Sequence, residues 1–170
     1  MSNETAPSEF LAIIEANKRI IYKIGNAYCK NVDDREDLAQ EIIFQLWRSW
    51  DSFNNNIKLS TWMYRIALNV AISFYRKSQK TATTTLMGDQ LITVIDENPN
   101  EELEANLNTL QQFINELKPL DKALIILYLE EKKHQEIAEI MGITVTNVAT
   151  KISRIKEQLK YKFSQIEYHG

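Results

Sequence analysis

Residues 134–154 carry polar and basic side chains at a spacing that suits the reading of duplex DNA. Ala138 is small enough for two helices to cross closely, Gly142 allows the positive φ of a tight turn, and Val148 packs the second helix back. This spacing predicts a helix-turn-helix, although an ordinary helical hairpin would share it. Short polar and basic side chains on the outer side of the second helix suit contact with base edges and phosphates in a major groove. These candidate residues are Thr146, Asn147, Thr150, Lys151 and Arg154.

A second candidate surface lies between Ser60 and Lys77, where aromatic and basic residues are interleaved. Aromatic rings beside cations suit separated DNA strands, because each stacked base contributes roughly 1–3 kcal/mol. The alternative is that the rings belong to the core, above all Trp62 and Phe74. The rings and cations of this segment are Trp62, Tyr64, Arg65, Phe74, Tyr75, Arg76 and Lys77.

Helices must position both surfaces, and the apolar spacing predicts an all-α chain. Only four Gly and three Pro occur, and the long stretches rich in Leu, Ile, Glu and Lys lack the alternation of strands. Asp34 and Ser60 have the chemistry of N-caps for the second and third helices. The helices predicted ahead of the helix-turn-helix span residues 10–30, 34–50, 60–77, 101–117 and 120–130.

Residues 81–100 separate two small helical domains in this prediction. The segment lacks periodic apolar residues and is rich in Thr, Asp and Asn, which is typical of a flexible linker. Residues 1–80 would form one domain and residues 101–170 the other. In the second domain a seven-residue apolar repeat that includes Leu103 and Leu107 marks the helix from Glu101, and Leu120 of the next helix is expected to face inward.

The distribution of charge favours DNA contact at two places. The net charge of −3 argues against a nucleic-acid binder when taken alone. Residues 58–80, however, hold five basic and no acidic residues, and residues 118–170 hold nine basic and seven acidic ones. The intervening residues 81–117 hold seven acidic and no basic residues. Steering and counterion release depend on local patches, although solvated charged faces are the alternative interpretation.

Enzymatic and metal-binding functions find no support in the sequence. His134 and His169 are the only histidines and lack a partner at metal-ligand spacing. The single cysteine, Cys29, excludes an internal disulfide and a cysteine-ligated zinc site. No phosphate-cradling glycine loop or nucleophile elbow is present. The sequence therefore predicts no catalytic residue, no metal and no cofactor.

The start of the chain has neither a basic n-region nor an apolar h-region, so a secretory signal is not expected. No apolar run reaches the length that spans a membrane. We therefore expect a cytoplasmic protein that does not insert into a membrane.

Two motifs resemble a single family, in the order that the family has them. The helix-turn-helix, preceded by Leu-Lys-Pro-Leu at 117–120, is similar to region 4 of sigma-70-class sigma factors. Segment 34–47 resembles region 2.2 of the extracytoplasmic-function subfamily, and segment 60–69 resembles the region that follows it. A free-standing helix-turn-helix regulator would explain only the first motif. A helical adaptor that binds only proteins would explain neither DNA surface.

The resemblance implies a role for each surface. The acidic segment would dock on the β′ clamp helices of core RNA polymerase, with the β subunit as a further contact. The helix-turn-helix would read the minus-35 element of promoter DNA, and the basic aromatic helix would recognise and melt the minus-10 element. An anti-sigma factor is a further expected partner. The implied docking residues are Asp37, Gln40, Glu41 and Gln45, and the implied minus-10 residues are Trp62, Arg65, Asn69, Arg76 and Lys77.

Overall fold

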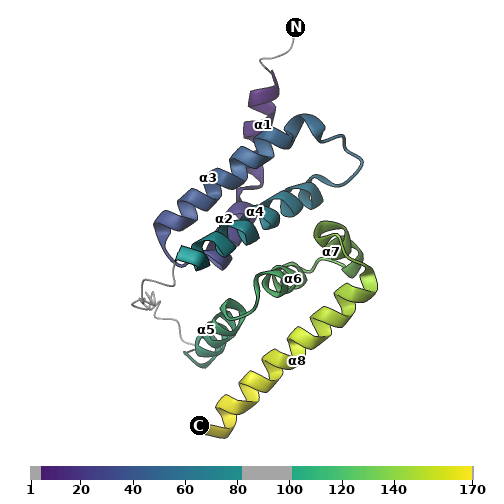
Figure 1. Ribbon diagram of the computed structural model, residues 1–170. Helices are drawn as coiled ribbons and strands as arrows, with labels where there is room; N and C mark the ends of the chain where they lie inside the picture. The colour runs from purple at the N-terminus through teal and green to yellow at the C-terminus, as the bar shows by residue number, and fades with distance from the viewer. Residues whose placement is uncertain (1–4, 82–100, 170) are drawn as a thin grey trace.

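The computed structural model describes residues 5–81 and 101–169, and all the regular structure within those ranges is helical (Figure 1). The predicted all-α class is thereby confirmed. From residue 82 onward, the expected linker lies outside the described residues. The division into domains at residues 80 and 101 stays a prediction.

The first part of the chain forms two helices, α1 (Thr5–Ala16) and α2 (Lys18–Tyr28), where the sequence predicted one helix over residues 10–30. The break falls at Asn17, whose side-chain Nδ2 donates a hydrogen bond to the carbonyl oxygen of Ile13 at 2.9 Å. Asn side chains compete in this way with the helical backbone hydrogen bonds. The apolar periodicity continues through Asn17, so periodicity alone could not reveal the break.

Helix α3 (Val32–Ser49) begins directly after its N-cap, Asn31. The Oδ1 atom of Asn31 accepts a hydrogen bond from the backbone N–H of Asp34 at 2.7 Å, and Nδ2 of Asn31 donates to Oδ2 of Asp34 at 2.8 Å. Asn31 therefore caps one backbone N–H of the first turn, and the Asp34 carboxylate holds the Asn31 side chain in place. The prediction that Asp34 is the N-cap was wrong: Asp34 completes the cap from inside the helix.

The 3-10 helix η1 (Trp50–Ser52) leads to α4 (Leu59–Thr81), which packs on α2 and α3. The first turn of α4 includes a hydrogen bond from the backbone N–H of Trp62 to the carbonyl oxygen of Lys58 at 3.1 Å. Ser60 therefore lies inside the helix, and the prediction that it is the N-cap was wrong. The largest fully buried side chains of these helices are Ile24, Leu38, Ile42, Leu46, Met63 and Leu68.

The second half begins with α5 (Glu101–Asn115) and α6 (Pro119–Leu129), close to their predicted starts. Leu120 is 49% exposed, so the prediction that it faces inward was wrong. Leu103 and Leu107, which belong to the apolar repeat of α5, are each 55% exposed. The C-terminal end of α5 is the part that packs: its residue Phe113 meets the Phe163 ring edge-on at 5.1 Å. The apolar repeat of α5 thus extends beyond the surface that its neighbours cover.

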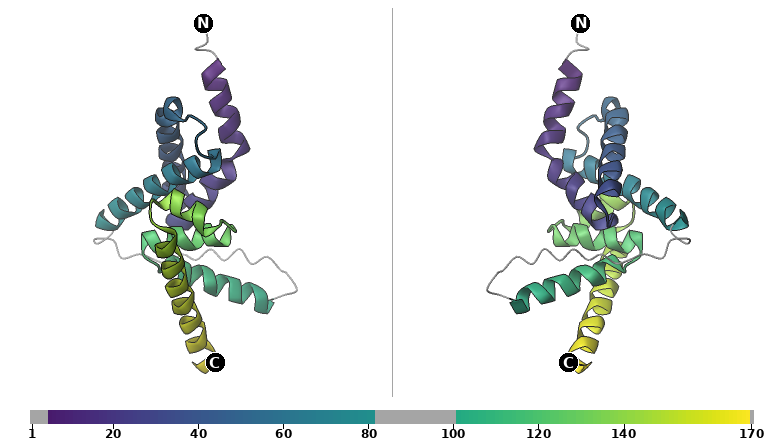
Figure 2. Two further views of the ribbon diagram at one scale, coloured as in Figure 1. Left: turned by 90° about the vertical axis from the view of Figure 1, so that its right-hand side faces the viewer. Right: turned by 90° about the vertical axis from the view of Figure 1, so that its left-hand side faces the viewer.

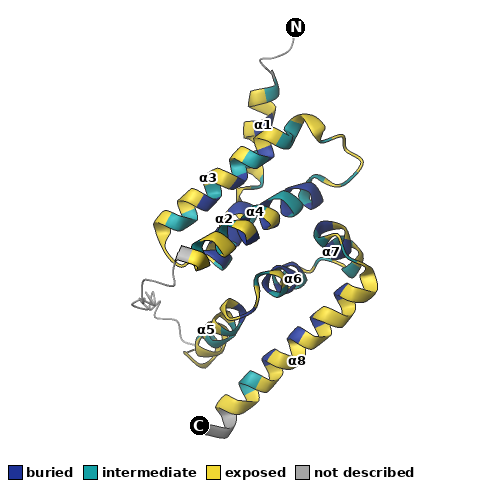
Figure 3. Cartoon of the chain, in the orientation of Figure 1, coloured by how far each residue is buried: buried dark blue, intermediate teal, exposed yellow. Residues whose placement is uncertain are grey.

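The chain ends with α7 (His134–Met141) and α8 (Val145–His169). Helices α6 and α7 lie against α4, so the two halves of the chain are in contact (Figure 1). The perpendicular views show α1 and the C-terminal end of α8 at opposite ends of the molecule (Figure 2). This arrangement leaves one side of α8 open to solvent along most of its length (Figure 3).

Candidate nucleic-acid interfaces

The turn between α7 and α8 has the geometry that the sequence predicted. Gly142 adopts φ 68° and ψ 35°, in the left-handed region. Its backbone N–H donates to the carbonyl oxygen of Ala138 at 2.9 Å, and the N–H of Ile143 donates to the same oxygen at 3.2 Å. These hydrogen bonds close the end of α7. The chain therefore reverses in three residues into α8, which makes the pair a helix-turn-helix.

A second cap starts α8. The Oγ1 atom of Thr144 accepts a hydrogen bond from the backbone N–H of Asn147 at 3.1 Å. Sequence reasoning missed this cap, although a Thr directly before the first helical residue is a usual signal. The cap fixes the N-terminal end of α8. The first helical turn there contains Thr146 and Asn147, two of the residues predicted to contact DNA.

The two sides of α8 differ as predicted. Val148, Ile152, Ile155 and Leu159 are buried against the neighbouring helices. The opposite side is exposed (Figure 3). It contains all five residues predicted to contact duplex DNA: Thr146, Asn147, Thr150, Lys151 and Arg154.

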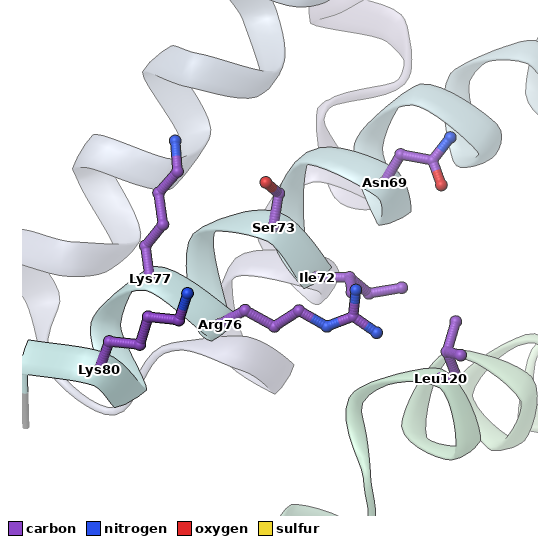
Figure 4. Close-up of a pocket in the computed structure, with 7 residues that line it drawn as sticks. All are labelled: Asn69, Ile72, Ser73, Arg76, Lys77, Lys80 and Leu120. Carbon is purple, nitrogen blue, oxygen red and sulfur yellow. The ribbon is translucent and has the colours of Figure 1, made fainter.

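Helix α4 presents a second polar and basic surface. Asn69, Arg76 and Lys77 are exposed, and Arg65 is half-buried. A cavity of about 460 Å³ opens beside this surface. Figure 4 shows Ile72 and Arg76 extending from α4 towards Leu120 of α6. The residues that line the cavity are Asn69, Ile72, Ser73, Arg76, Lys77, Lys80 and Leu120.

Trp62 does not belong to the exposed surface of α4. It is 7% exposed, and its ring lies 6.0 Å from Trp50 and 5.0 Å from Phe53, centroid to centroid. Clustered aromatic rings stabilise a hydrophobic core through buried apolar area and ring–ring contacts. The alternative that Trp62 is a core residue is therefore correct for this conformation, and the prediction that its ring offers a stacking platform is not.

The acidic stripe of α3 is accessible. Asp37, Gln40 and Glu41 are exposed and Gln45 is half-buried, with its Nε2 donating to Oε1 of Glu41 at 3.1 Å. Sequence reasoning missed Phe44 on the same helix, which is 52% exposed. An exposed aromatic ring beside acidic residues suits protein contact better than solvation.

Four titratable side chains are buried in the described part of the structure: Tyr28, Cys29, Tyr64 and Lys122. Burial raises the pKa of the Cys29 thiol to about 11 and that of the Tyr64 hydroxyl to about 12. Burial also raises the pKa of Tyr28 and lowers that of the Lys122 ammonium. The sequence offered no signal for the burial of Lys122, because it lies beside the charged residue Asp121 in the first turns of α6.

Residues 5–81 and 101–169 contain neither a metal-binding cluster nor a membrane-spanning helix. There, no three His, Cys, Asp or Glu side chains come together as a metal site would need. None of the described helices combines the length and the apolar character needed to cross a bilayer.

Comparison with known proteins identifies both halves of the chain. Residues 13–81 match the family described as Sigma-70 region 2, and residues 107–159 match Sigma-70 region 4. The ECF RNA polymerase sigma factor SigW of Bacillus subtilis (strain 168) is 35% identical over 163 residues, with 89% of this chain and 87% of SigW covered. The RNA polymerase sigma factor SigV of the same organism is 28% identical, with 95% of each chain covered.

Solved structures agree in fold. CnrH, solved in complex with the cytosolic domain of CnrY, matches 92% of this chain with a TM-score of 0.66 at 16% identity, and 88% of that chain is covered. The sigma factor RpoE of Bartonella quintana, solved with the anti-sigma factor NepR, matches 93% with the same TM-score at 19% identity, and 96% of that chain is covered. The chain therefore belongs to the extracytoplasmic-function subfamily of sigma-70-family RNA polymerase sigma factors, non-enzymatic DNA-binding proteins of transcription initiation.

Proposed function

We propose that this sigma factor uses three separate surfaces: α3 docks on core polymerase, α4 engages the minus-10 element, and α8 reads the minus-35 element. The observation that carries the proposal is the two-sided character of α8. Its buried stripe fixes the helix in place, while five polar or basic residues remain exposed on the other side. A helix held in this way presents side chains to a major groove without rearrangement.

The minus-35 contacts divide by chemistry. Lys151 and Arg154 supply positive charge for phosphates or guanine edges. Asn147, Thr146 and Thr150 supply neutral donors and acceptors. The hydroxyl of Thr150 already donates to the carbonyl oxygen of Thr146 at 3.0 Å, so Thr150 is left to act as an acceptor.

The minus-10 contacts come from Arg65, Asn69, Arg76 and Lys77. The exposed amide of Asn69 has the donors and acceptors needed to hold a flipped base, while the three cations track the backbone. Trp62 is left out of the proposal because its ring lies in the core. Captured bases offset the unstacking energy, so melting needs no nucleotide hydrolysis by this chain.

The docking contacts are Asp37, Gln40, Glu41 and Gln45, which would bind the β′ clamp helices of the polymerase. Three of these residues are exposed on consecutive turns of one rigid helix. Exposed Phe44 lies among them and supplies apolar area to the same contact. The β subunit would complete the docking.

The proposal also includes an anti-sigma partner and a cellular location. The similar RpoE structure is a complex with an anti-sigma factor, and we extend that class of partner to this chain. Work on polymerase and chromosomal DNA requires the chain to act in the cytoplasm. In this proposal, residues 1–80 form the domain for docking and minus-10 contact. Residues 81–100 form the linker, and residues 101–170 form the minus-35 domain.

Charge reversal at the docking stripe tests the proposal. Asp37→Lys combined with Glu41→Lys should abolish co-purification with core polymerase, because two attractive contacts become repulsive. The matched control is Glu9→Lys combined with Glu15→Lys, which makes the same charge change on exposed residues of α1. If the Asp37→Lys, Glu41→Lys variant co-purifies with core polymerase as well as the control variant does, the docking role of α3 is contradicted.

A further inference from the structure

One edge of the exposed side of α8 is largely apolar. Successive residues of an α-helix lie about 100° apart, so residues four positions apart form a row along its surface. Val145, Ala149 and Ser153 form such a row, and all three are exposed. The row contains no charged side chain and only one hydroxyl group. The residues proposed above for the minus-35 element all lie outside it.

The other edge of the same side is polar and basic. Asn147 and Lys151 form its row, and Arg154 follows three residues later. Thr146 and Thr150 lie between the two rows, in the middle of the exposed side. When such a helix lies in a major groove, its two edges meet the two sides of that groove. The two edges of α8 therefore have different chemistry to offer to the bases.

Val145 does not stabilise the fold by burial. It is 47% exposed, whereas Val148, three residues later, is 0% exposed. The hydrogen bond at 3.1 Å from the backbone N–H of Asn147 to Oγ1 of Thr144 fixes the helical turn in which Val145 lies. An apolar side chain is thereby held at the N-terminal end of the helix, which is the end that contacts base edges in helix-turn-helix proteins.

An apolar row has one matching group in the major groove. The C5-methyl group of thymine is the apolar substituent there, whereas the other groups that identify a base pair are hydrogen-bond donors and acceptors. An apolar side chain that covers a donor or acceptor leaves it without a partner, which is unfavourable. Contact with a methyl group instead removes apolar area from water on both sides. The apolar row therefore suits thymine better than any other base.

We propose that Val145 and Ala149 make the minus-35 contact selective for thymine, through the C5-methyl groups of A·T base pairs. This inference rests on the proposed minus-35 role of α8 and names the base that one edge of the helix reads. The side chain of Ala149 is a single methyl group, so this edge can lie close to the bases. The polar row contacts phosphates and polar base edges, while the apolar row distinguishes thymine from cytosine.

Replacement of thymine by deoxyuridine tests the proposal, because deoxyuridine pairs with adenine but lacks the C5-methyl group. The measured quantity is the affinity of holoenzyme, assembled from core polymerase and the full chain, for a promoter duplex found by start-site mapping. Replacing one contacted thymine of the minus-35 element should weaken binding about fourfold, the fold-change for loss of one buried methyl-sized group. The same replacement upstream of the element should have no effect.

Val145→Ser combined with Ala149→Ser assigns the effect to the apolar row. This variant should bind the thymine and deoxyuridine promoters equally, because its hydroxyl groups gain nothing from a methyl group. Val32→Ser is the matched control: Val32 is the first residue of α3, as Val145 is of α8, and it is 62% exposed. The control should keep the preference for thymine. All the substituted positions are exposed, and circular dichroism at the helical band verifies that the variants are folded.

Three results would overturn the thymine contacts. The holoenzyme could bind equally well with deoxyuridine at every thymine of the minus-35 element. The preference for thymine could persist undiminished when Val145→Ser and Ala149→Ser are combined. The minus-35 element found by start-site mapping could consist of G·C pairs only. In each case, weaker promoter binding by Lys151→Ala would show that the minus-35 role of α8 stands. Unchanged promoter binding by Lys151→Ala, together with no effect of deoxyuridine, would instead refute the minus-35 role and the thymine contacts with it.

Discussion

The guanidinium of Arg65 on α4 is hydrogen-bonded to the backbone carbonyl oxygen of Glu139 on α7, across 74 residues of sequence. One bond therefore joins the proposed minus-10 surface to the first helix of the helix-turn-helix. Because the acceptor belongs to the backbone, substitution of the Glu139 side chain does not remove it. The proposed minus-10 surface and the helix-turn-helix are thus in direct contact in this structure, and each can be tested by its own substitutions.

Asn69→Ala tests the minus-10 surface. Loss of one captured base should reduce open-complex formation by about 5- to 150-fold, which corresponds to roughly 1–3 kcal/mol. Permanganate footprinting of holoenzyme on promoter DNA measures the melting. Gln79→Ala, at an exposed position further along the same helix, should melt DNA normally. Equal footprints for the two variants would remove Asn69 from the proposed set.

Lys151→Ala tests the minus-35 surface. A phosphate contact contributes counterion release, so its loss should weaken binding about equally on all sequences and lower the salt slope by about 0.9. The measurement is a titration of duplex binding against salt concentration. Lys160→Ala removes the same charge from an exposed position two and a half turns later and should keep the slope. If only Lys160→Ala changed the salt slope, the DNA-binding surface would lie nearer the C-terminal end of α8 than proposed.

Gly142→Ala tests the turn. No atom lies within 4 Å of a Cβ built at this position, but φ is +68°, so the left-handed conformation should destabilise the fold by about 1–2 kcal/mol. Gly25→Ala is the matched control, because Gly25 is helical and its Cβ would meet only the carbonyl oxygen of Arg35 at 3.9 Å. That change should be neutral or stabilising, by up to about 1 kcal/mol. Chemical denaturation measures both, and equal losses would contradict the prediction.

Cys29 makes the fold sensitive to alkaline pH. A thiol has an ordinary pKa of 9.0, and burial raises that of Cys29 to about 11. Below pH 9 both states keep the proton. Between pH 9 and about 11 the unfolded chain loses it while the folded chain keeps it, so the free energy of unfolding should fall as pH rises.

Other buried groups contribute to the same pH range, and Cys29→Ala isolates the thiol. Tyr28 and Tyr64 act with the same sign above pH 10, whereas the lowered pKa of Lys122 acts in the opposite direction below pH 10.5. Denaturation at several pH values should therefore give a smaller loss between pH 9 and 11 in Cys29→Ala than in the unchanged chain. Parallel curves would show that the thiol titrates normally in the folded state.

Features determined by local chemistry were predictable from the sequence. The left-handed turn at Gly142 follows from the glycine and the apolar residues around it. The two sides of α8 follow from helical periodicity, and α5 begins at the predicted Glu101. Each of these features is determined by residues that are only a few positions apart in the sequence.

Features determined by distant contacts were not predictable. Trp62 and an exposed stacking ring look alike in sequence, and only the approach of Trp50 and Phe53 places Trp62 in the core. Lys122 is buried because residues far away in the chain supply a carbonyl oxygen and two aromatic faces. The spacing of apolar residues therefore could not predict the burial of Trp62 or of Lys122.

The most direct test of the account is transcription by core polymerase with this chain, with start sites mapped on genomic DNA. We expect promoter-specific starts that disappear when Asp37→Lys and Glu41→Lys are combined and weaken with Asn69→Ala or Lys151→Ala. Duplex binding without any promoter-specific start would contradict the sigma-factor function and leave a free-standing DNA-binding regulator.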